Sequence, residues 1–395
     1  MAMLASPSGR PLQIGLFAPY DLARPGGVNT QLRAQARALR QLGHRVRIYG
    51  PASAPLGQDE VALSRSVSVT VGGTESGLGL DLRSRARVAS LFETVPFDVV
   101  HVHEPLVPLL PWFALRYARS PIVATFHVHR EQGHRWYPLA RRWLRSLIRR
   151  VDVRVAVSDA ARRTVAAHFP GEYEVIPNAI DVDGFRAPRS RPALLATSSV
   201  STTPSIDRDP LHVLYVGRLE PRKGVDHLIR AMAGVHRVIP HARLIVVGDG
   251  PDRAALESLA RASGADVAFA GRVDDDALPA YVQASDVVCA PATGGESFGI
   301  VLLEAMACRK PIVASRIEGY EALVGPAGCG TLVPPGDAGA LGAAIRSLLG
   351  DATLRRTLGA RGLEAARAYD WPIIARRLDA IYQELLASRD SLLNV

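Results

Sequence analysis

Apolar runs of strand length alternate with helical segments along the chain, and the alternation occurs twice. In the first half we predict a helix over residues 28–42, and strands over residues 12–19, 45–49, 99–103, 122–126 and 154–157. In the second half we predict a helix over residues 225–238, and strands over residues 211–216, 243–247, 267–269, 287–290 and 311–314. Repeated strand–helix–strand units build parallel, doubly wound sheets. The expected fold is therefore α/β, with two Rossmann-like domains.

A segment rich in Pro, Ser, Thr and Arg interrupts this pattern at residues 187–210. Such a composition without an apolar period is typical of a flexible domain boundary. We expect an N-terminal domain over residues 11–190, a linker over residues 191–210 and a C-terminal domain over residues 211–372. A last helix over residues 373–395 is expected to complete the N-terminal domain.

Composition narrows the class of protein. The chain has 395 residues, of which 48% are hydrophobic and 22% charged, so it is globular rather than disordered. Three cysteines without metal-ligand spacing favour a reducing compartment, and neither a secretory signal nor a membrane span is expected. A net charge of +9 fits nucleic acid, an acidic membrane or anionic small substrates. No zinc finger, RNA-binding signature or Arg-Gly repeat favours nucleic acid.

Residues 294–304 are the most informative segment for function. A glycine-rich turn runs into an apolar helical stretch, and the backbone N–H groups at a helix start attract phosphate. Eight helical residues from Glu296 to Glu304 would advance about 12 Å, close to the distance from the sugar to the ribose of a nucleotide sugar. Glu296 could then bind sugar hydroxyls and Glu304 the ribose. The alternative is an ordinary loop-to-helix junction.

Two further features of the sequence involve positive charge. Only two of the 47 basic residues are lysines, so Lys223 can mark a need for a compact ammonium group. A second feature is a basic amphipathic stretch with interleaved Trp136 and Trp143, which is typical of a surface lying on acidic lipid. Its alternative is the solvated face of a packed helix. Its arginines are Arg135, Arg141, Arg142, Arg145, Arg149 and Arg150.

Three motifs occur in the order found in a known family. Gly26-Gly27-Val28 follows the first strand, Gly217-Arg218 precedes Arg222-Lys223-Gly224, and Glu296 precedes Glu304. Together they resemble the donor-site motifs of the GT-B nucleotide-sugar glycosyltransferases of family 4. The resemblance covers nearly the whole chain. It implies two Rossmann-like domains whose parallel sheets face each other across a cleft, with a nucleotide sugar as the donor.

The resemblance also implies roles for individual residues. Arg218 and Lys223 would bind the diphosphate of the donor, and His127 would contact the transferring sugar. The alternative for Arg218 and Lys223 is a surface ion pair with Glu220 or Asp226. Sugar transfer would retain the anomeric configuration, with the leaving phosphate accepting the acceptor's proton, and would need neither a metal nor a tightly bound cofactor. The expected donor site comprises Gly26, Gly27, Arg218, Lys223, Glu296, Ser297, Phe298, Gly299, Ile300 and Glu304.

Within that family, Pro19-Tyr20, His103-Glu104-Pro105 and Thr125-Phe126-His127 look most similar to the phosphatidyl-myo-inositol mannosyltransferases. This resemblance implies GDP-mannose as the donor and a lipid acceptor, at the cytoplasmic face of the cell membrane. Tyr20 and Asn29 are expected to lie on the acceptor side. The residues expected to face the membrane are Arg83, Arg85, Arg87, Arg141, Arg142 and Arg145.

The chain departs from that pattern on the acceptor side, where Asn29, Leu106 and Val128 replace a Gln, an Asn and a Thr. Apolar Leu106 and Val128 cannot hydrogen-bond a polyol as amide and hydroxyl groups do. A diacylglycerol or soluble glycan acceptor therefore remains an alternative. A UDP-hexose donor is a further alternative, because it would use the same phosphate-binding groups.

Two readings outside this chemistry also remain open. The pairs His101/His103 and His127/His129 alternate along strands and could hold zinc, as in a metal-dependent hydrolase. A sugar-nucleotide-binding protein without catalytic activity is the other.

Overall fold

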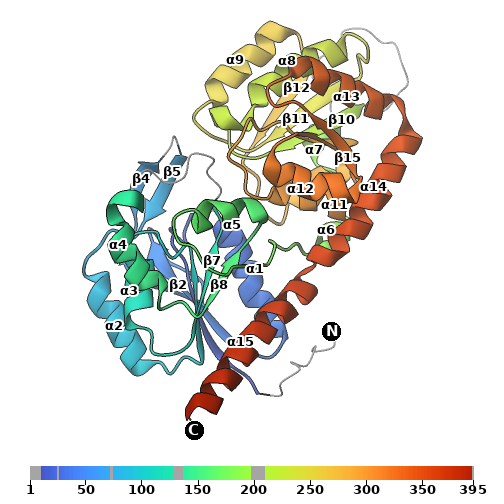
Figure 1. The fold of residues 1–395 in the computed structure, drawn as a ribbon. Helices are drawn as coiled ribbons and strands as arrows, with labels where there is room; N and C mark the ends of the chain where they lie inside the picture. The colour runs from blue at the N-terminus through green and yellow to red at the C-terminus, as the bar shows by residue number, and fades with distance from the viewer. Residues whose placement is uncertain (1–9, 25, 72–73, 129–136, 197–209, 394–395) are drawn as a thin grey trace. The chain divides into compact units, whose positions relative to one another are not determined.

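A computed structural model describes residues 10–24, 26–71, 74–128, 137–196 and 210–393. The chain divides into two compact units (Figure 1). The first unit contains residues 1–179 and 371–395, and the second contains residues 180–370.

The first unit is built on a parallel sheet with the order β3-β2-β1-β6-β7-β8-β9. The order reverses between β1 and β6, which are direct neighbours. Ligands of doubly wound sheets bind beyond the carboxyl ends of the strands at such a reversal. The strands are β1 (Gln13–Phe17), β2 (Arg45–Ala52), β3 (Glu60–Arg65), β6 (Val99–His103), β7 (Ile122–Phe126), β8 (Val153–Ala156) and β9 (Glu174–Val175).

Helices cover both faces of this sheet because successive strand residues point to opposite sides. Leu16 packs in the core formed with α1 (Gly27–Gln41) and α15 (Trp371–Leu393). Its neighbour Phe17 packs in the core formed with the helices of the other face. Those helices are α2 (Ser84–Thr94), α3 (Leu110–Tyr117) and α4 (Tyr137–Ile148), and a further helix is α5 (Asp159–Ala166).

An antiparallel pair formed by β4 (Val67–Val71) and β5 (Thr74–Leu78) joins the first unit. It pairs with the loop after β1 through a bridge between Tyr20 and Leu78. The sequence pattern did not predict this pair.

The second unit repeats the same architecture, with the sheet order β12-β11-β10-β13-β14-β15 and the reversal between β10 and β13. The strands are β10 (Leu211–Val216), β11 (Ala242–Val247), β12 (Val267–Gly271), β13 (Val287–Ala290), β14 (Ile312–Ser315) and β15 (Gly330–Val333). One face packs on α8 (Val225–His236), α9 (Arg253–Ser263) and α13 (Ala338–Gly350). The other face packs on α10 (Leu278–Ala284), α11 (Ile300–Ala307), α12 (Glu318–Ala327) and α14 (Ala352–Ala366).

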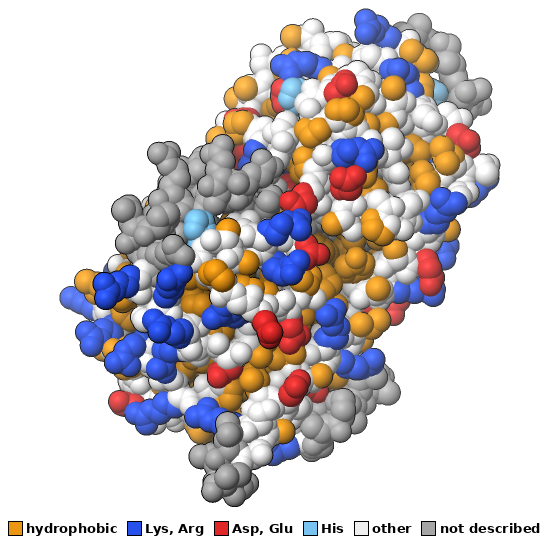
Figure 2. Space-filling view, in the orientation of Figure 1, with side chains coloured by type: hydrophobic (Ala, Val, Ile, Leu, Met, Phe, Trp, Pro, Cys, Tyr) orange, Lys and Arg blue, Asp and Glu red, His pale blue; other side chains and the backbone are white. Residues whose placement is uncertain are grey.

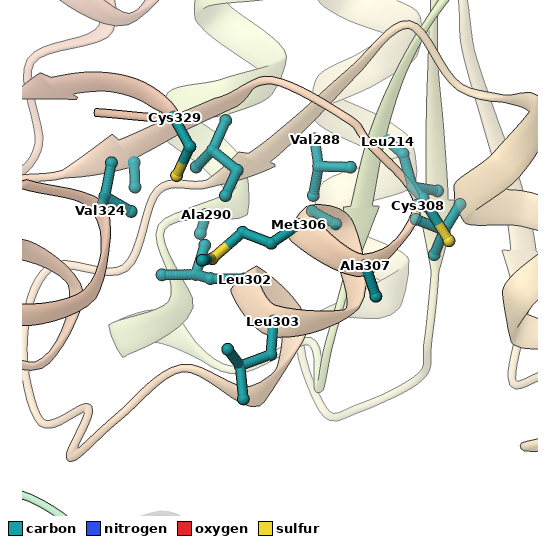
Figure 3. Close-up of a cluster of buried hydrophobic side chains, with 14 of the residues drawn as sticks. Leu214, Val288, Ala290, Leu302, Leu303, Met306, Ala307, Cys308, Val324 and Cys329 are labelled. Atoms are coloured by element: carbon teal, nitrogen blue, oxygen red, sulfur yellow. The ribbon is translucent and has the colours of Figure 1, made fainter. Parts of the chain in front are cut away.

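Helix α11 lies inside the hydrophobic core of the second unit (Figure 3). Leu302 and Met306 are fully buried among side chains that include Val288 and Ala290 of β13. Close packing of this kind fixes the start of the helix relative to the strand that precedes it.

The strands at residues 99–103, 122–126, 211–216 and 287–290 are confirmed with the predicted bounds. The change of unit falls at residue 180, earlier than the predicted linker, because α6 (Val182–Arg186) and α7 (Ala193–Ala196) pack on the second unit. The amide of Gln283 donates hydrogen bonds to the carbonyl groups of Phe185 and Ala187. Residues 197–209 of the predicted linker lie outside the described residues. In the part of the chain that is described, none of the helices combines the length and hydrophobicity of a membrane span.

Candidate functional site

The candidate donor site of the second unit lies in the loops that follow β10 and β13, on both sides of the reversal in strand order. The first loop carries Arg218 and the short 3-10 helix η1 (Pro221–Lys223), and the second carries Glu296. Both loops leave the carboxyl ends of neighbouring parallel strands, so the fold alone brings them to one edge of the sheet.

Backbone contacts then hold the two loops together. The N–H of Thr293 donates to the carbonyl oxygen of Arg222 at 2.8 Å. Gly224 has a φ of +65°, and a Cβ atom at this position would lie 2.2 Å from the carbonyl oxygen of Pro291. Only glycine combines that φ with such a close approach of two backbones. Gly224 therefore lets η1 lie directly against the loop after β13.

The charged side chains on these loops form a continuous network of ion pairs. Nζ of Lys223 lies 2.7 Å from Oε1 of Glu296, and Arg222 also pairs with that carboxylate. Arg222 further reaches Glu220 at 3.3 Å, and Nε of Arg218 lies 2.6 Å from Oε1 of Glu220. The network contains three cations and two carboxylates, so one positive charge exceeds what the carboxylates neutralise.

The pKa of Glu296 reflects this network. Burial alone would raise the pKa of this carboxyl group, but the charges and hydrogen bonds of Lys223 and Arg222 outweigh burial and hold it below the ordinary value. Glu296 is therefore ionised at neutral pH.

The ion pairs considered as an alternative are present in part. Arg218 pairs with Glu220, and the Arg218 side chain is 46% exposed while that of Glu220 is 3% exposed. Lys223 pairs with Glu296 rather than with Asp226, while Asp226 pairs with Arg230 at 2.5 Å. Glu220 and Arg222 are thus members of the site that sequence reasoning did not assign.

The prediction that one helix links Glu296 to Glu304 is wrong, because α11 begins only at Ile300. Gly299 precedes the helix with a φ of +90°, and a Cβ atom there would lie 2.8 Å from the ring of Tyr320. The 12 Å spacing therefore does not apply. The first turn of α11 contains no acidic residue, so no side-chain charge of the helix competes for its N-terminal N–H groups.

The remaining residues of the predicted donor loop form its packed part. Phe298 is buried and contacts the ring of Tyr369 edge-on at 5.9 Å between centroids. Ser297 and Ile300 are partly buried. The backbone at Glu296 and Ser297 lies against Gly319 near the start of α12, where a Cβ atom would lie 2.3 Å from the carbonyl oxygen of Glu296.

Glu304 lies on α11, whose neighbouring side chains Leu303 and Ala305 are fully buried. Burial raises the pKa of Glu304 to about 7, with a further contribution from the negative charge of Asp275. Within the described residues, the Glu304 carboxyl group has no hydrogen-bonded or ion-paired protein partner. Such a group can bind a hydroxyl-rich ligand without first breaking an internal bond.

In the first unit, the glycines after β1 begin α1. Gly26 precedes the helix in an extended conformation, and its carbonyl accepts the N–H of Thr30 at 2.9 Å. Gly27 is the first helical residue, and no side chain caps this end. Pro25 lies outside the described residues.

The two predicted acceptor residues differ in what they contact. Asn29 is buried, and its amide donates to the carbonyl oxygens of Asp21 at 2.7 Å and Arg24 at 3.0 Å. This amide therefore stabilises the loop after β1. Tyr20 is partly buried in that same loop. Acceptor binding by either residue stays a prediction.

His127 follows β7 and is part of a buried polar cluster. Its Nε2 lies 2.9 Å from Nδ1 of His103, and Oε1 of Glu104 accepts the backbone N–H groups of His127 and Val128. Burial lowers the pKa of His127 to about 4, so the ring is neutral at physiological pH. His103, considered from sequence only as a zinc ligand, and Glu104, to which no chemical step was assigned, thus contact His127 directly.

Among the described residues, the histidines do not form the ligand set that zinc chemistry would require. His101 uses both ring nitrogens on protein groups, with Nδ1 2.6 Å from the Tyr382 hydroxyl and Nε2 2.7 Å from the Thr125 hydroxyl. His129 lies outside the described residues. Across the described ranges, no group of three or more His, Cys, Asp or Glu residues could hold a metal ion. Leu106, which departs from the family pattern on the acceptor side, is buried in the core of the first unit.

Arginine side chains gather on the face of the first unit that carries α2, α3 and α4 (Figure 2). Exposed apolar groups lie beside them, with Leu82 73% exposed and Trp143 47% exposed. Trp143 packs edge-on against Trp112 of α3. We define the basic patch as the exposed residues Arg83, Arg85, Arg87, Arg142 and Arg145. The Arg141 side chain and residues 135–136 lie outside the described part.

Comparison with known proteins gives concordant matches. The family model of glycosyl transferases group 1 matches residues 201–365, and that of glycosyltransferase family 4 matches residues 25–183. The phosphatidyl-myo-inositol mannosyltransferase of Mycobacterium leprae (strain TN) is 36% identical over 95% of this chain and 98% of its own length. A GDP-mannose-dependent monoacylated alpha-(1-6)-phosphatidylinositol monomannoside mannosyltransferase of Corynebacterium glutamicum is 32% identical over 67% of this chain and 70% of its own length. The structure of sucrose-phosphate synthase from Thermosynechococcus elongatus superimposes with a TM-score of 0.73 at 25% identity, over 95% of this chain and all of that one.

Proposed function

The chain belongs to the family 4 glycosyltransferases with the GT-B fold, and from this premise we propose that it transfers mannose from GDP-mannose to phosphatidyl-myo-inositol. The acceptor follows the name of the Mycobacterium leprae relative, and the donor follows that of the Corynebacterium glutamicum relative. The metal-dependent hydrolase does not fit this membership, and measured turnover of a sugar nucleotide would exclude the non-catalytic binding protein.

The network around Glu296 is the observation that carries the proposal. A nucleoside diphosphate sugar offers a doubly charged pyrophosphate and a neutral, hydroxyl-rich sugar. The positive charges of Arg218 and Lys223 complement the negative charge of the pyrophosphate, and the Glu296 carboxylate can accept hydrogen bonds from the sugar hydroxyls. When Glu296 accepts hydrogen bonds from the sugar, its hold on Lys223 weakens and the ammonium group becomes available to the phosphate.

The chemical step requires stabilisation of charge on the departing phosphate. Fixed cations aimed at that charge are commonly the largest catalytic contribution. We assign this role to Lys223 and Arg218, assisted by the N–H groups at the start of α11. Glu304 binds the ribose, and His127 of the first unit contacts the transferring sugar. We further propose retention of configuration, with the leaving phosphate accepting the proton of the attacking hydroxyl, and action at the cytoplasmic membrane face.

The test is a matrix of GDP-mannose, UDP-glucose and UDP-galactose against phosphatidylinositol vesicles, diacylglycerol vesicles and soluble glycans, read by mass spectrometry. We expect one added hexose only with GDP-mannose and phosphatidylinositol. Product from a UDP-sugar, or from diacylglycerol or a soluble glycan alone, would contradict the proposed substrates. Proton NMR of the product tests retention, because an inverted anomeric centre would exclude same-face transfer.

A further inference from the structure

The residues around His127 determine both where its ring lies and which ring nitrogen carries the proton. His103 is the last residue of β6, and in the parallel register it lies opposite Thr125 of β7. Strand side chains two residues apart share a face, so the ring of His127 comes beside that of His103. The two rings stack with centroids 5.2 Å apart, and Nδ1 of His103 lies 2.9 Å from Nε2 of His127.

The backbone at His127 is held as firmly as its ring. Glu104 is 4% exposed and has a φ of +46°, a left-handed conformation that is uncommon for a residue other than glycine. This conformation lets its carboxylate accept the N–H groups of His127 and, at 2.8 Å, of Val128. Non-glycine residues keep such a conformation where surrounding contacts determine it, often at functional sites.

The position of the proton on His127 follows from the surroundings of His103. Burial lowers the pKa of both imidazoles, to about 4 for His127 and well below the ordinary value for His103, where charge on His101 or His127 lowers it further. Both rings are therefore neutral, and each carries one N–H. The bond between them has two possible directions, depending on which ring donates.

The burial of Nε2 of His103 distinguishes between the two directions of the His103–His127 hydrogen bond. Nε2 of His103 is buried and has no hydrogen-bond partner among the described residues. If His127 donated, His103 would carry its proton on this atom, as a buried and unpaired donor. If His103 donates from Nδ1, the buried Nε2 is only an unused acceptor. Orphaned buried N–H groups are the rarer of the two defects.

We propose that His103 and Glu104 are positioning residues that present His127 to the substrate as a hydrogen-bond donor through Nδ1–H. The His103 ring donates to Nε2 of His127 and so places the His127 proton on Nδ1. Glu104 fixes the backbone from which the ring projects. The inference rests on the proposed function in assigning the transferring sugar as the recipient, and a sugar oxygen would accept the hydrogen bond.

Long-range proton–nitrogen NMR of the full-length protein labelled with 15N-histidine tests this tautomer directly. Comparison with a His127→Asn variant assigns the signals of His127. We expect a protonated Nδ1 and an unprotonated Nε2 in the unliganded protein. A proton on Nε2 of His127 would overturn the inference, and this result needs no enzymatic activity and no other variant.

Variants then connect the tautomer to turnover. We expect His103→Leu to release the tautomer preference and lower kcat about tenfold or more, with a smaller change in the KM for the donor. His103→Gln keeps an amide donor and should restore both the tautomer and most of kcat. Glu104→Ala should lower kcat similarly, while Glu104→Gln keeps an acceptor oxygen and loses less. Unchanged kcat in both His103→Leu and Glu104→Ala would overturn their positioning role.

His212→Gln is the matched control. His212 is also buried with a pKa lowered to about 4 by burial, but it belongs to the second unit, where its Nδ1 lies 3.3 Å from the Arg191 guanidinium. Its replacement should leave the His127 signals and kcat unchanged. If the protein shows the expected tautomer but transfers no hexose from any donor, the proposed function is contradicted. The hydrogen-bond assignment then still stands.

Discussion

Lys223 and Glu296 illustrate how a single ion pair can prepare a site for a ligand. In the unliganded protein each partner satisfies the other, at 2.7 Å and with the Lys223 side chain only 18% exposed. A nucleotide sugar offers each of them a better-matched partner, because phosphate is an anion and sugar hydroxyls are donors. Donor binding would then exchange one set of charge-assisted bonds for another without leaving a buried charge unpaired.

Replacement of Lys223 by Ala should affect turnover far more than folding. Arg222 still pairs with Glu296, so the carboxylate keeps one cation. The developing phosphate charge loses its ammonium group, and we expect kcat/KM for the donor to fall about a hundredfold, as when one transition-state donor is removed. Arg230→Ala is the matched control, since Arg230 is an exposed residue of α8 paired with Asp226. Near-normal turnover of Lys223→Ala at saturating donor would refute the assignment.

Glu304 predicts a pH dependence of donor use. Its pKa is raised to about 7, so the carboxyl group is ionised above that pH and protonated below it. The ionised form is the stronger acceptor for ribose hydroxyls. We therefore expect kcat/KM for the donor to rise with pH and level off above about 7, changing by up to about tenfold per pH unit on the acid side.

The control for this prediction is Glu304→Gln, which keeps the shape of the side chain but does not titrate. It should lower kcat/KM and remove the dependence near pH 7. If the pH profile of kcat/KM keeps its midpoint near pH 7 in Glu304→Gln, the titrating group is not Glu304. Stopped assays across pH 5.5–9, with the variant and wild-type protein in the same buffers, make the comparison.

Secondary-structure elements show where sequence reasoning succeeds. The strand at residues 122–126 is apolar except for Thr125 and is buried along its whole length, which is the pattern of a central parallel strand. The glycine-rich loop after β13 could also be found from sequence, because Gly295 and Gly299 have φ values of +71° and +90°, which favour glycine. These features are local, and a local pattern suffices to identify them.

Features that depend on contacts between distant residues could not be found in this way. Arg222 and Glu296 are separated by 74 positions, and nothing in the spacing shows that they pair. His103 and His127 meet only because β6 and β7 are neighbours in register. The start of α11 was misplaced because the helical spacing was counted from Glu296, whereas the apolar run and the helix both begin at Ile300, directly after Gly299 with its φ of +90°. Sequence identified Arg218, Lys223 and Glu296 as site residues, but it assigned neither Glu220 nor Arg222 and did not show how these charges pair.

At the scale of the whole molecule, the basic patch bears on where the protein acts. Its five arginines are exposed on α4 and at or next to the first turn of α2, two helices that both contact α3. Leu82 and Trp143 add apolar surface to the same face. Basic side chains attract anionic headgroups, and interfacial aromatic and aliphatic side chains bury in the boundary region of the bilayer. The patch therefore has both features of a surface that binds an acidic membrane.

Replacing the patch arginines with Gln should weaken binding to vesicles that contain anionic lipid, because each basic residue near the surface contributes about 1 kcal/mol. We expect at least about a hundredfold loss of partitioning by flotation for the five-fold variant, with the hydrolysis of donor in solution unchanged. The matched control has the same change in net charge on exposed arginines of the second unit, Arg237, Arg261, Arg316, Arg356 and Arg361. Equal losses in the two variants would show that net charge alone drives binding, and no loss in either would remove the membrane role of the patch.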